Sequence, residues 1–167
     1  MTISELQTHR ITPFEISDDK MESLFSFFLH IAPTIDSRTA MNIAPERLHN
    51  NWQCFLEASN LEPRIIYAEG YSNLVHSCEK NGLGHHVEIT RRTKGFICIR
   101  KGRENDYECV LRHIRNSIAH SNVFYCNAGN RKFVLFEDYS NNKKNKLTAR
   151  LLFSQTTLIS LKKEITK

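Results

Sequence analysis

The segment NDYECVLRHIRNSIAH, residues 105–120, carries the clearest helix signal in this sequence. Asn105 and Glu108 have the spacing of a capping box, in which each side chain accepts a hydrogen bond from the backbone of the other residue. Five apolar residues then recur at helical spacing and form one face: Tyr107, Val110, Leu111, Ile114 and Ile118. The segment therefore predicts a helix that buries one side and presents polar residues on the other.

The polar side of this predicted helix carries the side chains that we expect to be functional. His113, Asn116 and His120 are spaced by three and four residues, so a continuous helix places them on one face. Arg115 flanks the apolar stripe, and Arg112 lies on the same side as Arg115. A histidine can accept a proton from a ribose 2′-hydroxyl near neutral pH, and an arginine can bind the phosphodiester and stabilise the charge of the transition state. With Asn116 orienting either group, this set suits RNA cleavage without a metal.

The six residues Arg115-Asn116-Ser117-Ile118-Ala119-His120 resemble the Arg–x4–6–His motif of the HEPN superfamily, with the polar residue that commonly follows the arginine. The similarity covers about residues 104–123. The resemblance implies a helical bundle that homodimerises, so that two motifs form one composite cleft. It also implies a metal-independent endoribonuclease, often of a toxin–antitoxin or anti-phage system, with an antitoxin or a nucleotidyltransferase as the type of partner. Arg115, Asn116 and His120 would then be the catalytic residues.

Two alternatives stay open at this point. The bare spacing of an arginine and a histidine also fits a histidine that only ends a helix, beside a solvated arginine. A HEPN fold that has lost catalysis would instead serve as an RNA-binding, protein-interaction or dimerisation module. The segment after His120 is predicted to be β, which departs from the plainest helical members of the superfamily.

Around the central helix, the sequence predicts a mainly α fold. Further helices are expected after Ser17, from Pro45 and from Pro63, where apolar residues recur at helical spacing. The period changes after residue 120, and three short β-branched and aromatic segments joined by turn residues predict a small antiparallel hairpin or meander.

We therefore expect one HEPN-like domain over residues 1–167, a bundle of four to five helices with a β appendage near the C-terminus. The helical core would span about residues 17–121 and the β appendage about 123–153. A C-terminal helix would follow at about 156–166.

Residues 85–103 fit either a short helix with a loop or a strand, because the apolar run at 96–99 is too short to distinguish the two. Basic side chains surround this run and are expected to contact RNA phosphates, although a solvated face is the commoner role of such residues. The candidate RNA-binding residues are Arg91, Arg92, Lys94, Arg100 and Lys101, with Arg112 and His113 of the predicted helix.

Composition limits the class of protein. A hydrophobic fraction of 40% and a charged fraction of 25% are those of a globular chain rather than a disordered one. The formal charge of +5 fits an anionic partner. The five cysteines are odd in number, widely spaced and without a CxxC pair, so we expect reduced thiols in a cytoplasmic protein. We expect no secretory signal, no membrane span, no metal and no other cofactor, because no segment or motif typical of them occurs.

Overall fold

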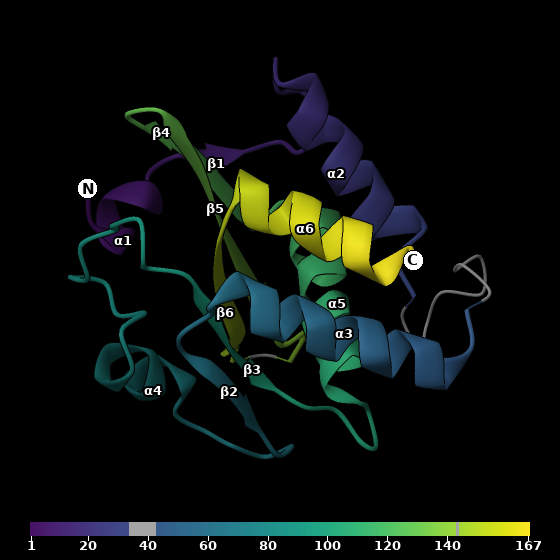
Figure 1. Ribbon diagram of the computed structural model, residues 1–167. Helices are drawn as coiled ribbons and strands as arrows, with labels where there is room; N and C mark the ends of the chain where they lie inside the picture. Colours follow the sequence, from purple (N-terminus) through teal and green to yellow (C-terminus); the bar gives the residue numbers. More distant parts are fainter. Residues whose placement is uncertain (34–42, 143) are drawn as a thin grey trace.

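A computed structural model describes residues 1–33, 43–142 and 144–167, so the part of the predicted helical core at 34–42 lies outside the described residues. In the described chain, a single six-stranded sheet lies between two layers of helices (Figure 1). The strand order is β1-β4-β5-β6-β3-β2. β2 runs parallel to β3, and the other neighbouring strands are antiparallel.

The elements have the following bounds. The strands are β1 (Arg10–Ile11), β2 (Arg64–Tyr67), β3 (Gly95–Ile99), β4 (Val123–Ala128), β5 (Arg131–Tyr139) and β6 (Leu147–Ser154). The helices are α1 (Ile3–Leu6), α2 (Asp19–His30), α3 (Pro45–Ser59), α4 (Leu74–Lys80), α5 (Asp106–Ala119) and α6 (Gln155–Ile165). None of the described helices is both long enough and apolar enough to cross a membrane.

The prediction of a mainly α bundle with a small β appendage is wrong, because the sheet forms the centre of the molecule. The described chain is 40% helix and 24% strand. The three strands expected as an appendage, β4, β5 and β6, lie in the middle of the sheet, and the ambiguous segment 85–103 supplies β3 beside β6. Their unbroken apolar runs at 133–136 and 151–153 have a physical reason, since helices or loops cover both faces of these strands.

The helix predicted from Pro63 is also wrong in its first half. Residues 64–67 form β2, and α4 begins only at Leu74. The run Ile65-Ile66-Tyr67 is β-branched and aromatic, which favours a strand, and Ile66 pairs with Cys98 in the parallel ladder. The partner strand β3 lies far along the chain, so the local pattern could not reveal the pairing.

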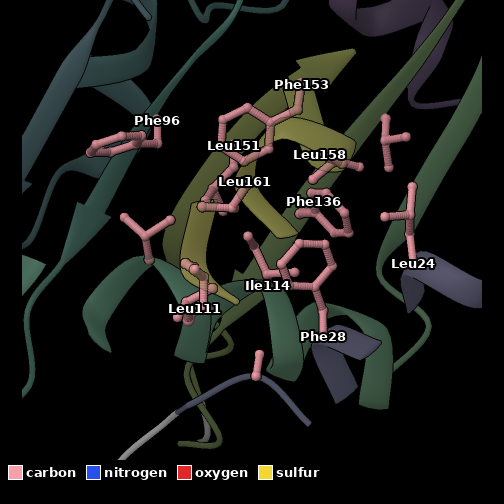
Figure 2. Close-up of a cluster of buried hydrophobic side chains, with 14 of the residues drawn as sticks. Leu24, Phe28, Phe96, Leu111, Ile114, Phe136, Leu151, Phe153, Leu158 and Leu161 are labelled. Atoms are coloured by element: carbon pink, nitrogen blue, oxygen red, sulfur yellow. The ribbon is translucent and has the colours of Figure 1, made fainter. Parts of the chain in front are cut away.

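Helices α2, α3, α5 and α6 cover one face of the sheet, and the main hydrophobic core lies beneath them (Figures 1 and 2). Val134 and Phe136 of β5 belong to this core, whereas the alternating residues Phe133 and Leu135 belong to the opposite side. Phe136 is fully buried and meets Phe25 of α2 edge to face, with 6.3 Å between ring centroids. Such alternation packs both faces of one strand at once.

The opposite face of the sheet is covered by α1, α4 and the segment around Leu83 and Ile89. A buried ion pair crosses this layer, where Glu137 of β5 and Arg150 of β6 lie opposite each other in register with 2.8 Å between their charged groups. Both side chains are buried within this otherwise apolar layer.

The helix predicted at 105–120 coincides with α5, and the C-terminal helix predicted at about 156–166 coincides with α6. The Glu108 carboxylate accepts the predicted hydrogen bond from the Asn105 backbone N–H at 2.7 Å. α5 packs against β5 and α2, so its apolar face is buried and its remaining side chains face the molecular surface or the end of the sheet.

Candidate functional site

α5 delivers the two residues of the predicted motif to the molecular surface. His120 is the C-cap of the helix and is exposed, while Arg115, in the last turns, is half-buried. Neither side chain has a hydrogen bond or an ion pair with any other residue that the structure describes. Both groups are therefore available to a ligand or to another copy of the chain.

A tight turn fixes the main chain next to His120. The N–H of Ser121 donates to the carbonyl of Ile118 at 3.1 Å, and the N–H of Asn122 donates to the carbonyl of Ser117 at 2.8 Å. These two bonds define a Schellman motif. Ser121 occupies the left-handed region with a φ of 54°, where glycine is usual.

Arg10 of β1 holds the same turn from outside the helix. Its Nε donates to the Ser121 carbonyl at 2.7 Å, and its Nη2 donates to the side-chain oxygen of Asn122. The backbone at His120 is thus fixed both by the helix end and by the first strand of the sheet.

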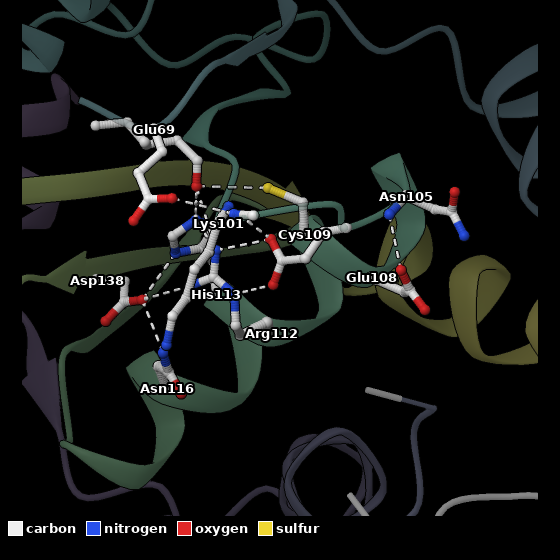
Figure 3. A network of polar contacts seen from close by, with 12 residues as sticks. Glu69, Lys101, Asn105, Glu108, Cys109, Arg112, His113, Asn116 and Asp138 are labelled. Atoms are coloured by element: carbon white, nitrogen blue, oxygen red, sulfur yellow. Dashed lines mark hydrogen bonds and ion pairs between the residues drawn. The ribbon is translucent and has the colours of Figure 1, made fainter. Parts of the chain in front are cut away.

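Earlier on the same helix, Arg112 points into a buried polar network (Figure 3). Its guanidinium binds both carboxylate oxygens of Glu104, through Nε and through Nη2, the latter at 2.9 Å. Nη2 also donates to the Ile99 carbonyl at 3.2 Å. Arg112 is therefore committed to partners of its own chain, as a bidentate arginine–carboxylate pair.

His113 is the centre of this network and is 1% exposed. Its Nδ1 lies 2.7 Å from the Asp138 carboxylate and its Nε2 lies 2.8 Å from the Ile99 carbonyl, so both ring nitrogens face acceptors. Burial disfavours the charged ring, but the bonds with Asp138 and Cys109 outweigh burial and raise the pKa of His113. Arg112 Nη2 also lies 3.2 Å from Nε2, and the His113 ring joins α5, β5 and the end of β3.

Asn116 joins the network instead of reaching His120. Its Nδ2 donates to the same oxygen of Asp138 at 3.0 Å. His113 and Asn116 thus share the face predicted from their spacing, and Asp138 brings them together. The N–H of His120, the C-cap, donates to the Asn116 carbonyl at 3.0 Å, and the His120 side chain forms no bond with this network in the described chain.

Glu104 and Asp138 were missed by the sequence reasoning. Asp138 did leave a signal, since it follows the apolar run of β5 where a buried strand would otherwise continue. Glu104 left none, because it precedes the helix and becomes significant only through the contact with Arg112.

The five cysteines are free thiols, and three of them are buried. Cys109 lies beside the network, where the neighbouring Cys98 thiol lowers the pKa of Cys109 to about 6, with His113 acting in the same direction and burial opposing both. Among the described residues, no group of three or more metal-binding side chains gathers at one place.

The network opens onto a cleft of about 520 Å³. Its lining includes Arg112, His113, Asn116 and Asp138, together with cationic residues at its rim. Arg115 and His120 do not line this cleft. The candidate site residues of α5 therefore fall into those that line this cleft and those that do not, Arg115 and His120.

The structure divides the predicted RNA-binding residues into two groups at opposite ends of β3. Arg91 and Lys94 line a cleft before the strand, with Arg92 exposed in the turn between them. Arg100 and Lys101 follow the strand and line the cleft beside the network. Arg100 also forms an exposed ion pair with the first residue of α5.

The family model described as HEPN pEK499 p136 matches residues 13–167. The match contains every element from α2 to α6 and leaves out α1 and β1. Comparisons with curated proteins and with solved structures give no match.

Proposed function

Because this chain belongs to the HEPN pEK499 p136 family and so to the HEPN superfamily, we propose that it is a HEPN-type endoribonuclease that needs no metal. The observation that carries the proposal is the placement of Arg115 and His120. Both lie at the open end of α5, without partners in the described chain, on a backbone held by the Schellman turn and by Arg10.

The proposed reaction is transesterification at an RNA phosphodiester. His120 takes the proton of the ribose 2′-hydroxyl, the 2′-oxygen bonds to phosphorus, and the bond to the 5′-oxygen breaks, which leaves a 2′,3′-cyclic phosphate. Arg115 binds the non-bridging oxygens and stabilises the negative charge that they gain. The leaving 5′-oxygen needs a proton, and a second histidine best supplies it.

That requirement supports a composite site formed by two copies of the chain. One copy offers one histidine and one arginine at the end of α5, which is half of the groups that the reaction uses. Asn116 acts as a positioning residue in this proposal, because its bond to Asp138 holds the helix that carries Arg115.

Cleavage of single-stranded RNA in excess EDTA tests the proposal. We expect wild-type protein to produce cyclic phosphate ends, and His120→Ala or Arg115→Ala to reduce the rate by at least about a hundredfold, within the range of losses for an acid–base or charge-stabilising group. His49→Ala and Arg47→Ala, both exposed on α3, are matched controls that should cleave normally. Cleavage that requires added metal, or that survives both motif substitutions, would refute the mechanism.

The composite site is tested by dilution. Specific activity should fall as the protein is diluted below the concentration at which sedimentation shows dimers. Constant specific activity in a solution of monomers would show that a single chain suffices.

We further propose a toxin–antitoxin or anti-phage role in the cytoplasm, with an antitoxin or a nucleotidyltransferase as partner. Expression in a bacterial host should then arrest growth, and His120→Ala should abolish the arrest. Equal growth of cells with either protein would argue against a toxic activity.

A non-catalytic RNA-binding module is the second candidate. The two basic clefts at the ends of β3 favour it, because phosphate contacts need cations but no histidine. Salt-sensitive RNA binding by wild-type protein without any cleavage would identify this function.

A further inference from the structure

The strand topology brings three segments to one place at the edge of the helical layer. β3 begins at Gly95, opposite Leu152 of β6, and Phe133 of β5 lies opposite Ser154 at the end of β6. The starts of β3 and β5 therefore flank the end of β6, where α6 begins. A cleft of about 570 Å³ opens between them.

This basic cleft is lined by Arg91 and Lys94 before β3, by Arg131 and Lys132 of β5, and by polar residues at the start of α6. Its lining includes no aspartate and no glutamate. Arg112, by contrast, forms an ion pair with Glu104. The absence of acids from the lining leaves a concentrated positive charge.

Three of the four cations have no counter-charge among the residues that the structure describes. Lys132 forms an ion pair with Asp18. Burial alone would raise the pKa of Asp18, but the hydrogen bonds with Lys132 and Tyr125 lower this pKa to about 2. The side chains of Arg91, Lys94 and Arg131 form no hydrogen bond or ion pair with any described residue. An anion that enters the cleft would be the first partner of each.

The segment that carries Arg91 is held in a defined shape. The Thr90 N–H donates to Thr93 Oγ1 at 2.9 Å, and Thr93 Oγ1 donates to the Glu88 carbonyl at 3.1 Å. A cation on such a turn loses less conformational freedom on binding than a cation on a loose loop.

We propose that the basic cleft binds the phosphate backbone of a single RNA strand, at a site separate from Arg115 and His120. The volume is sufficient for nucleotide-sized groups. The single aromatic side chain of the lining, Phe133, is 3% exposed and so offers no face on which a base can stack. Contacts to phosphates without base stacking predict binding that is independent of RNA sequence. This cleft lies at the start of β5, and it would act as a second anchoring point for the strand in addition to the α5 end.

Salt dependence of RNA binding tests the proposal in the His120→Ala protein, so that cleavage does not interfere. Each phosphate contact to a single strand contributes about 0.7 to the slope of log affinity against log salt. Replacing Arg91, Lys94 and Arg131 with glutamine should therefore lower the slope by about 2. Between about 50 and about 200 mM salt, the parent protein should lose about fifteen- to twentyfold more affinity than the triple variant.

The matched control replaces Arg47, Arg64 and Lys80 with glutamine, which removes the same charge from exposed positions outside the cleft. Its slope should remain close to that of the parent protein. Equal salt slopes for both triple variants would overturn the proposal. Binding of inorganic tripolyphosphate or free nucleotide in the cleft, without binding of RNA, would also overturn it.

Failure of the proposed RNA site is distinguishable from failure of the proposed ribonuclease activity. If the cleft variant has a smaller salt slope but wild-type protein cleaves no RNA, the RNA site is supported and the nuclease activity is refuted. If wild-type protein cleaves RNA but the cleft variant keeps the parent salt slope, the nuclease activity is supported and the RNA site is refuted.

Discussion

Replacing Asp138 with asparagine tests how strongly the buried network holds α5. The Asp138 carboxylate is 4% exposed and accepts hydrogen bonds from His113 at 2.7 Å and from Asn116 at 3.0 Å. It also lies 4.0 Å from the guanidinium of Arg112. Asparagine keeps the size of the side chain and removes its charge, so the perturbation is electrostatic.

The expected cost is about 3–5 kcal/mol of the free energy of unfolding, the usual loss when one partner of a buried ion pair is removed. His113 is 1% exposed, so water cannot replace the missing carboxylate. A domain of this kind is commonly stable by about 5–15 kcal/mol, and the variant would lose a large part of that.

The same substitution should alter the pH dependence of stability. The pKa of His113 is raised in the folded protein, so its stabilising contribution is complete below the unfolded value of about 6.5 and is lost as pH rises through the folded pKa. Wild-type protein should therefore lose this contribution as pH rises above about 6.5, and Asp138→Asn should lack that loss.

Urea unfolding followed by circular dichroism, at about pH 6 and at a series of higher pH values, measures both effects. Asp106→Asn is the matched control, because Asp106 forms an exposed ion pair with Arg100 and such pairs contribute at most about 1 kcal/mol. The reasoning is refuted if Asp138→Asn unfolds within about 0.5 kcal/mol of wild-type protein, or if the two proteins show the same pH dependence.

Two further predictions concern the helix end and the thiols. Ser121→Val should lower the free energy of unfolding by about 1–2 kcal/mol, because a β-branched residue tolerates the left-handed region poorly, whereas Ser121→Gly should cause no loss. Thermal unfolding of both variants measures this difference, and equal stability of the two variants would contradict the strained turn. In native protein, a thiol reagent should label the exposed Cys54 first and the partly buried Cys126 next, as followed by peptide mass spectrometry. Rapid labelling of a third thiol before unfolding would contradict the burial of the remaining cysteines, Cys78, Cys98 and Cys109.

Local patterns predicted α5 well, because its capping residues and its apolar period lie within one segment. The β segments after residue 120 were also recognised from their composition, but their role was not. Unbroken apolar runs such as 133–136 indicate strands covered on both faces, and that signal points to a central sheet rather than an appendage. β2 was not predicted, because its neighbour in the described sheet is β3, a parallel strand far along the chain.

The sequence also predicted only part of the candidate site. The spacing of His113 and Asn116 correctly placed them on one face of α5, and the family match agrees with the HEPN resemblance of the motif. The spacing did not reveal that Arg112 and His113 are buried, because their partners Glu104 and Asp138 meet them only through the fold.

The short outer strands of the sheet restrict how two copies of this chain can meet. At one edge β1 has two residues and covers the start of β4, and at the other β2 has four residues. Short edge strands offer few free backbone groups for another sheet to extend. Two copies that bring their α5 ends together would therefore associate through helices and side chains, and an interface of that kind can be redesigned by surface substitutions without disturbing the ladder of the sheet.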